Sequence, residues 1–88
     1  LSQISLEFRS QALKQLKRLP EGEMIRIFKK IQLLRTDPLP ENARKLSGSS
    51  GLFRLRVGHY RVLYAMDKRS GVITILSVLH RKEAYRNL

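Results

Sequence analysis

The 88-residue sequence contains no cysteine, and only seven of its residues are acidic. The absence of cysteine excludes disulfides, thiolate zinc sites and cysteine nucleophiles. No apolar run approaches the roughly 18 residues that a membrane-spanning helix needs. The first residues alternate polar and apolar types, unlike the apolar block of a signal peptide. We therefore expect one soluble, cytoplasmic domain that spans residues 1–88.

The sequence also lacks the residue sets of most known catalytic centres. Its acidic residues form no spaced carboxylate cluster, and its two histidines, His59 and His80, are isolated. Metal sites need such clusters, so no metal is expected. No Gly-rich phosphate loop, Ser-His-Asp set or glycosidase-like carboxylate pair is recognisable. We therefore expect a protein that works without a metal or another cofactor.

Positive charge is abundant: 18 lysines and arginines give a net charge of +11. Such a charge on a short chain points to a polyanionic partner, which can be nucleic acid, an anionic membrane or a strongly acidic protein. A protein that binds the membrane surface would need a basic amphipathic helix with exposed bulky apolar residues. The apolar stripes of the expected helices suit burial in a core instead. Nucleic acid or a nucleoprotein is therefore the favoured partner.

Hydrophobic periodicity predicts a strand and two helices in the first half of the chain. Residues 3–8 alternate as in a short strand. A helix is expected from Ser10, its N-cap, to residue 17 or 18, and a second from Glu21 to about Thr36. The segment 38–51 is rich in turn formers and is expected to be a loop. The apolar residues of the second helix recur at the spacing of a buried stripe: Met24, Ile27, Phe28, Ile31 and Leu34.

The segment 53–66, FRLRVGHYRVLYAM, predicts a β-hairpin with a two-residue turn at Gly58–His59. Because strand side chains alternate, this register places Arg54, Arg56 and Arg61 on one face, with Arg56 directly opposite Arg61. Like charges in such a position repel one another, so the pair makes sense if its partner is an anion. The planar guanidinium suits phosphate oxygens and a charged transition state.

A β-branched strand from Val72 to Leu79 completes the layout. The order of elements predicts an α+β fold: a helical hairpin covers one face of a four-stranded antiparallel sheet, and a short segment follows. A shift of the pairing register by one residue moves every side chain of a strand to the other face of the sheet. A four-residue loop before this strand would put Val78 and His80 on the arginine face, whereas a five-residue loop would put Leu79 and Arg81 there.

The C-terminal segment 80–88 carries a second cationic cluster with two groups that can move protons. His80 is a candidate general base near neutral pH. Tyr85 is a candidate proton donor or acceptor, or a stacking partner for a base. The cations that we expect to bind RNA are Arg44, Lys45, Lys82 and Arg86.

A nuclease built from these residues would have to act without a metal. RNA permits such chemistry, because its 2′-OH attacks the adjacent phosphate while the enzyme supplies a proton acceptor, a proton donor and cations. DNA lacks this internal nucleophile. The residues therefore favour RNA as a substrate.

Four stretches resemble toxins of the RelE/ParE superfamily of bacterial and archaeal type II toxin–antitoxin systems. They are SLEFRSQALKQLKRLP, DPLPENARKLSG, LFRLRVGHYRVLYAMD and ILSVLHRKEAYRNL, which together cover essentially the whole chain. The resemblance implies a compact α+β fold, a catalytic face made by the sheet and the C-terminal segment, and neutralisation by an acidic antitoxin that is partly disordered when free. RelE-branch toxins are ribosome-dependent mRNA endonucleases; they act in the A site by 2′-OH attack and leave a cyclic phosphate.

The resemblance also implies roles for single residues. Leu52 stands where some members have a lysine that helps catalysis, and no glutamate lies between Glu41 and Glu83 to act with a histidine, as in other relatives. The functional positions of the RelE branch correspond here to Arg54, Arg56, Arg61, Arg81 and Tyr85.

Three functions stay open at this point. The retention of Arg61, Arg81 and Tyr85 favours the RelE branch, and hence an mRNA endonuclease that inhibits translation. The ParE branch shares the fold but inhibits DNA gyrase, so a gyrase inhibitor without nuclease activity is the alternative. An RNA-binding module without activity is the third.

Overall fold

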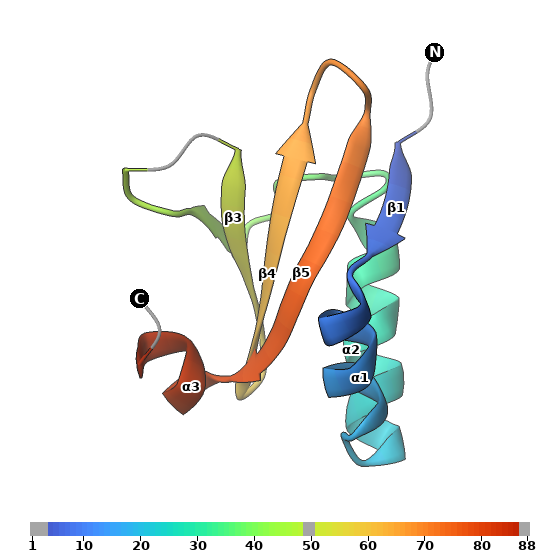
Figure 1. Ribbon diagram of the computed structural model, residues 1–88, viewed down its shortest axis with the longest axis vertical. Helices are drawn as coiled ribbons and strands as arrows, with labels where there is room; N and C mark the ends of the chain where they lie inside the picture. Colours follow the sequence, from blue (N-terminus) through green and yellow to red (C-terminus); the bar gives the residue numbers. More distant parts are fainter. Residues whose placement is uncertain (1–3, 49–50, 87–88) are drawn as a thin grey trace.

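The computed structural model describes residues 4–48 and 51–86, and only the backbone of Tyr85 and Arg86. The elements follow in the order β1 (Ser5–Phe8), α1 (Ser10–Lys17), α2 (Glu21–Leu33), β2 (Ala43–Lys45), β3 (Leu52–Val57), β4 (Tyr60–Asp67), β5 (Val72–His80) and α3 (Arg81–Arg86). Helices α1 and α2 lie on one side of the sheet and α3 on the other (Figure 1). The expected α+β fold is confirmed. Within the described residues, no helix is long and apolar enough to cross a membrane.

The sheet has five strands in the order β1-β5-β4-β3-β2. The prediction of a four-stranded antiparallel sheet was therefore wrong in two respects. First, β1 runs parallel to β5. Two helices and three strands separate β1 from β5 along the chain, and such a long connection permits parallel pairing, whereas the tight hairpins β3–β4 and β4–β5 require antiparallel pairing.

Second, a strand that the sequence did not predict, β2, forms the far edge of the sheet. It lies within the segment expected to be a loop and pairs antiparallel with β3. Three residues are too few to display an alternating pattern. The Asn42 side chain strengthens the junction, because its Nδ2 donates to the Arg56 carbonyl at 2.7 Å while the Arg56 N–H donates to the Asn42 carbonyl at 3.0 Å.

The helix boundaries differ slightly from the expected ones. The N-cap of α1 is Arg9, which makes no side-chain capping bond, so Ser10 is the first helical residue and not the cap. Helix α2 ends at Leu33, three residues before Thr36. Beyond it, the N–H of Thr36 and the N–H of Leu34 donate to carbonyls three residues back. This tighter turn ends the α-helix and satisfies its last carbonyls.

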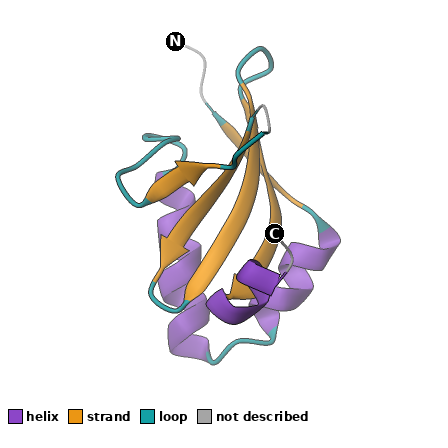
Figure 2. Cartoon of the chain, turned by 90° about the vertical axis from the view of Figure 1, so that its left-hand side faces the viewer, coloured by secondary structure: helices purple, strands orange, loops and turns teal. Residues whose placement is uncertain are grey.

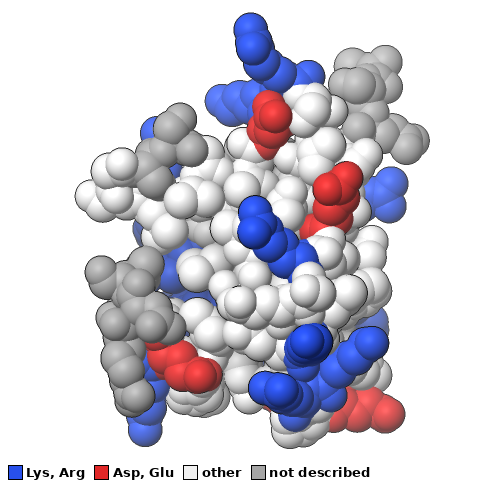
Figure 3. All heavy atoms as spheres, in the orientation of Figure 1, with Lys and Arg blue, Asp and Glu red and all other residues white. Residues whose placement is uncertain are grey.

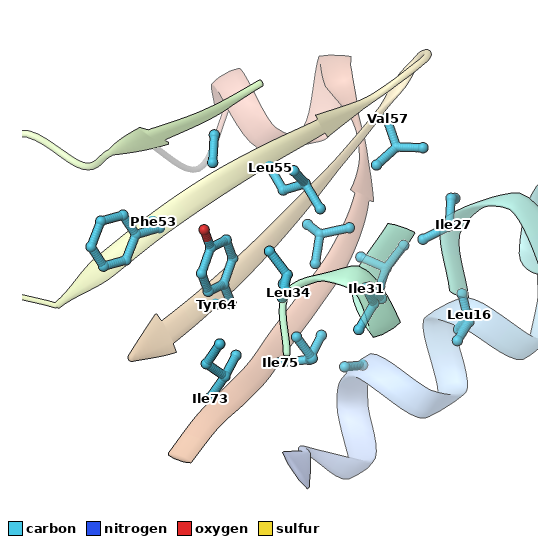
Figure 4. Packing of buried hydrophobic residues seen from close by; sticks show 14 residues of the cluster. Leu16, Ile27, Ile31, Leu34, Phe53, Leu55, Val57, Tyr64, Ile73 and Ile75 are labelled. Carbon is cyan, nitrogen blue, oxygen red and sulfur yellow. The ribbon is translucent and has the colours of Figure 1, made fainter. Parts of the chain in front are cut away.

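The core lies between α1, α2 and the sheet (Figure 4). Ile27, Ile31 and Leu34 of the predicted stripe are fully buried. Phe28 is 41% exposed, so the stripe is narrower than expected. Tyr64 is fully buried among them, and its hydroxyl donates to the Pro38 carbonyl at 2.7 Å. This bond ties the segment after α2 to the middle of the sheet.

The β3–β4 hairpin has the predicted register. Arg56 lies opposite Arg61, and Val57 lies opposite Tyr60. Gly58 has a φ of 59°, and among the described residues only glycines have positive φ. A positive φ at the first turn residue alone is typical of a type II′ turn, whose twist matches that of a hairpin.

The β4–β5 loop has four residues, since Asp67 pairs with Val72 across residues 68–71. In a regular hairpin this length would place His80 on the face of Arg61.

A β-bulge next to Leu63 and Tyr64 changes that outcome, because it shifts the pairing by one residue. An extra residue in one strand reverses every side chain beyond it. Leu79 therefore lies opposite Arg61, and His80 turns away from the arginine face.

Candidate active site

Four arginines line one open hollow on the sheet face opposite α1 and α2. Arg44 pairs with Arg54 across β2 and β3, and Arg56 pairs with Arg61 across β3 and β4. Because strand side chains alternate, all four extend from the same face. The hollow has a volume of about 240 Å³, and Glu41 and Asn42 complete its lining. The structure thus brings together Arg54, Arg56 and Arg61, as predicted from the hairpin, and adds Arg44.

Main-chain carbonyls hold two of these guanidinium groups at the rim. Arg61 Nη1 donates to the carbonyls of Gly58 and Tyr60 at 3.1 and 2.9 Å. Arg44 Nη1 donates to the carbonyls of Glu41 and Ala43 at 3.1 and 3.2 Å. A planar guanidinium fixed at one nitrogen keeps a defined orientation. The site is therefore arranged for a bound anion whose oxygens contact several forks at once.

Positive charge alone does not distinguish this hollow from the rest of the surface. In the view of Figure 3, lysine and arginine side chains are spread over the surface, and acidic side chains lie singly among them. What distinguishes the hollow is that cations from three adjacent strands, β2, β3 and β4, converge on it. Opposed like charges are unfavourable in a sheet, so their concentration at one place favours a binding role.

Glu41 is the lining residue that sequence reasoning missed. It lines the hollow of the arginines, and its carbonyl accepts from Arg44, although its place in a turn-rich loop gave no periodic signal. The pairing of β2 with β3 brings this loop back to the sheet. A carboxylate in this position can accept a proton from a group that the arginines bind.

His80 does not line the hollow. Its ring stacks on His59 with a centroid distance of 6.2 Å and meets the Tyr60 ring edge-on at 5.5 Å. Its Nδ1 accepts a hydrogen bond from the Lys82 N–H at 3.3 Å. The bulge in β5 is the reason why this candidate base lies away from the four arginines.

Helix α3 lies on the same sheet face as the arginines, in front of the strands in Figure 2. It covers the end of β5, where Ser77 and Leu79 are buried on that face, and its own Ala84 is only 1% exposed. Arg81 and Lys82, at the start of α3, are exposed. The side chains of Tyr85 and Arg86 lie outside the described residues.

Lys45 lies on the opposite face of β2 from Arg44, because neighbouring residues of a strand alternate. It borders a second hollow of about 430 Å³, together with Lys68, Arg69 and the apolar Phe53. The structure therefore separates two of the cations that were expected to bind RNA together. Among residues 4–48 and 51–86, no group of three or more histidine and acidic side chains is arranged to hold a metal ion.

Comparison with known proteins identifies the family. A family model described as "ParE toxin of type II toxin-antitoxin system, parDE" matches residues 6–85. The chain belongs to the RelE/ParE superfamily of toxins. It is 31% identical over 86 residues to the protein RelE1 of Methanocaldococcus jannaschii, a match that covers 94% of this chain and 96% of that protein. The resemblance stated from the sequence is thus confirmed.

Solved structures of RelE toxins have the same fold. A chain of the archaeal RelE–RelB complex from Pyrococcus horikoshii is 30% identical, with a TM-score of 0.80 and coverage of 89% of this chain and 94% of that chain. A chain of the toxin–antitoxin complex RelBE2 from Mycobacterium tuberculosis is 28% identical, with a TM-score of 0.78 and coverage of 91% and 100%. Within the superfamily, the protein is therefore a toxin of the RelE type.

Proposed function

We propose that this RelE-type toxin is a metal-independent endoribonuclease that cleaves mRNA in the ribosomal A site and so inhibits translation in the cytoplasm. The observation that carries the proposal is the hollow that four arginines line together with one acidic residue, Glu41. It supplies cations for the charge on a phosphate in the transition state and an acceptor for a proton, which are the two requirements of 2′-OH attack.

In the proposed reaction, the 2′-OH gives its proton to the acceptor and its oxygen attacks the adjacent phosphorus. The bond from phosphorus to the 5′-oxygen of the next nucleotide breaks, and that oxygen takes up a proton. The products are a 2′,3′-cyclic phosphate and a 5′-OH. Arg54, Arg56 and Arg61 hold the phosphate and stabilise the added negative charge of the transition state.

We assign the acceptor role to the Glu41 carboxylate, because Glu41 lines the hollow of the arginines whereas His80 does not. Glu41 would thus take the role of the catalytic glutamate of some relatives, for which the segment between Glu41 and Glu83 offers no candidate. Tyr85, at a functional position that the family resemblance implies, is the candidate proton donor. Arg81 assists from α3, and Arg44, Lys45, Lys82 and Arg86 contact RNA of the message or the ribosome.

The proposal includes an antitoxin as partner. Solved complexes of RelE with RelB from Pyrococcus horikoshii and Methanococcus jannaschii support it. A net charge of +11 suits an acidic protein. The helical layer also exposes apolar side chains, since Leu13, Phe28 and Leu33 are 38, 41 and 57% exposed. An acidic, amphipathic segment that folds on binding would match both features.

Inhibition of DNA gyrase is the second candidate function, because the matching family model carries the ParE description.

One experiment separates the candidate functions. The purified protein is incubated with mRNA, with and without programmed ribosomes and with EDTA throughout, and gyrase supercoiling is assayed in parallel. Codon-phased cleavage that needs ribosomes and leaves a cyclic phosphate supports the nuclease. Inhibited supercoiling with intact mRNA would eliminate it. RNA binding without cleavage products would support the third function, an RNA-binding module without activity.

A further inference from the structure

Two hydrogen bonds from backbone N–H groups to side chains hold the passage from β5 into α3. Glu83 Oε1 accepts from the His80 N–H at 3.2 Å, and His80 Nδ1 accepts from the Lys82 N–H at 3.3 Å. The arrangement resembles a capping box, in which the N-cap side chain accepts from the N–H of the third helical residue and the side chain of that residue accepts from the N-cap N–H. Here the His80 ring accepts from the N–H of the second helical residue, Lys82, instead. His80 occupies the cap position, which serine or threonine usually fills.

A six-residue helix such as α3 needs this support. Isolated helices of that length are unstable in water, because nucleation costs more than a few hydrogen bonds return. The capping box satisfies N–H groups that the first turn leaves without intrahelical partners. The Arg81 N–H adds a bond of 2.7 Å to the His59 carbonyl, which fixes the start of α3 against the β3–β4 turn.

The same turn anchors one side of the arginine hollow. The carbonyls of Gly58 and Tyr60, on either side of His59, accept from the Arg61 guanidinium. The start of α3 and the orientation of Arg61 therefore depend on one short stretch of backbone. Loss of the cap would free Arg81 from its place beside this turn, while the core under α1 and α2 would stay intact.

We propose that His80 is a positioning residue: it caps α3 together with Glu83 and thereby holds the Arg81 backbone beside the β3–β4 turn whose carbonyls anchor Arg61, without transferring a proton. The ring geometry fits this role, since Nδ1 is engaged by the helix and the ring lies against His59 and Tyr60. The effect on cleavage rests on the proposed function, whereas the effect on α3 does not.

The test compares substitutions that keep or remove the capping acceptors. His80→Asn keeps a side-chain oxygen that caps well but cannot act as a base at neutral pH, whereas His80→Ala removes the cap. Glu83→Gln keeps the second acceptor, and Glu83→Ala removes it. His59→Asn is the matched control, because it removes a neighbouring histidine and leaves the backbone carbonyl that binds Arg81.

Two readouts are made on the full chain. NMR Cα shifts of residues 81–86 report the helix, and ribosome-programmed cleavage reports activity. We expect both alanine variants to lower the helix-to-coil ratio of α3 roughly five- to tenfold and to lower kcat with it. Both amide variants and His59→Asn should retain the helix and the activity.

Two results would overturn the proposal. One is a His80→Asn variant with an intact α3 and no cleavage, because His80 would then transfer a proton. The other is a His80→Ala variant with unchanged shifts, because the capping box would then not support α3. If the unchanged protein cleaves no RNA, the proposed function fails, and the chemical shifts still decide whether His80 caps the helix.

Discussion

Arg56 lies directly opposite Arg61 across the β3–β4 ladder, and both side chains line the same open hollow. Two like charges directly opposite one another across a ladder destabilise a hairpin. The arrangement therefore costs the toxin stability, which the proposed binding of a phosphate would offset.

This opposition predicts a variant that is more stable and less active. Arg56→Gln relieves the repulsion, so the free energy of unfolding should rise by about 0.5 kcal/mol while cleavage falls. Urea denaturation measures the first effect. Lys29→Gln, an exposed position on α2, removes the same charge without a cross-strand neighbour and should change stability little. Lower stability for Arg56→Gln than for Lys29→Gln would contradict the interpretation.

The Glu41 carboxylate should be essential for proton transfer. Glu41→Gln keeps the shape of the side chain and removes its basicity, so kcat should fall on the order of 10²–10⁴-fold. KM should not rise, because the variant also removes a negative charge from an anion site. Glu7→Gln, an exposed glutamate on β1, is the control. Glu41 has no role as the acceptor if kcat in Glu41→Gln matches the control.

Tyr64 should make stability depend on alkaline pH. Burial, and after it the charge of Asp37, raises the pKa of Tyr64 from 10.0 to about 12. A pKa that folding raises favours the neutral phenol in the native state, so this contribution is complete below pH 10 and is lost as pH rises through 12.

The comparison with Tyr64→Phe isolates this effect. The variant loses the bond to the Pro38 carbonyl, so it should be about 1 kcal/mol less stable near neutral pH. The difference between the two proteins should shrink between pH 10 and 12, as denaturation at several pH values will show. A constant difference across that range would mean that the phenol titrates alike in the folded and unfolded chains.

Local rules predicted part of this structure, and the failures have physical causes. Strand alternation and a two-residue turn were enough to place Arg54, Arg56 and Arg61 on one face, because a hairpin is local. The bulge in β5 cannot be predicted from local rules of this kind. Beyond it, Ser77 and Leu79 face α3 and are buried, and no pattern in the strand marks where the register shifts.

The same limits apply to the site. Glu41 reaches the arginines only because three residues of β2 pair with β3, and that pairing is too short to leave a periodic signal. The sequence left open whether His80 lies on the arginine face. The shifted register places it on the other face, and its Nδ1 accepts from the Lys82 N–H at the start of α3.

The most direct test is cleavage of mRNA on programmed ribosomes by the unchanged protein and by Arg61→Ala. Arg69→Ala, which removes a cation from the second hollow, is the control. If the four arginines stabilise the transition state, kcat of Arg61→Ala should fall by about 10²–10³-fold. The unchanged protein and Arg69→Ala should cut within the A-site codon. Cleavage by Arg61→Ala at the rate of Arg69→Ala would contradict the central role of the arginine hollow.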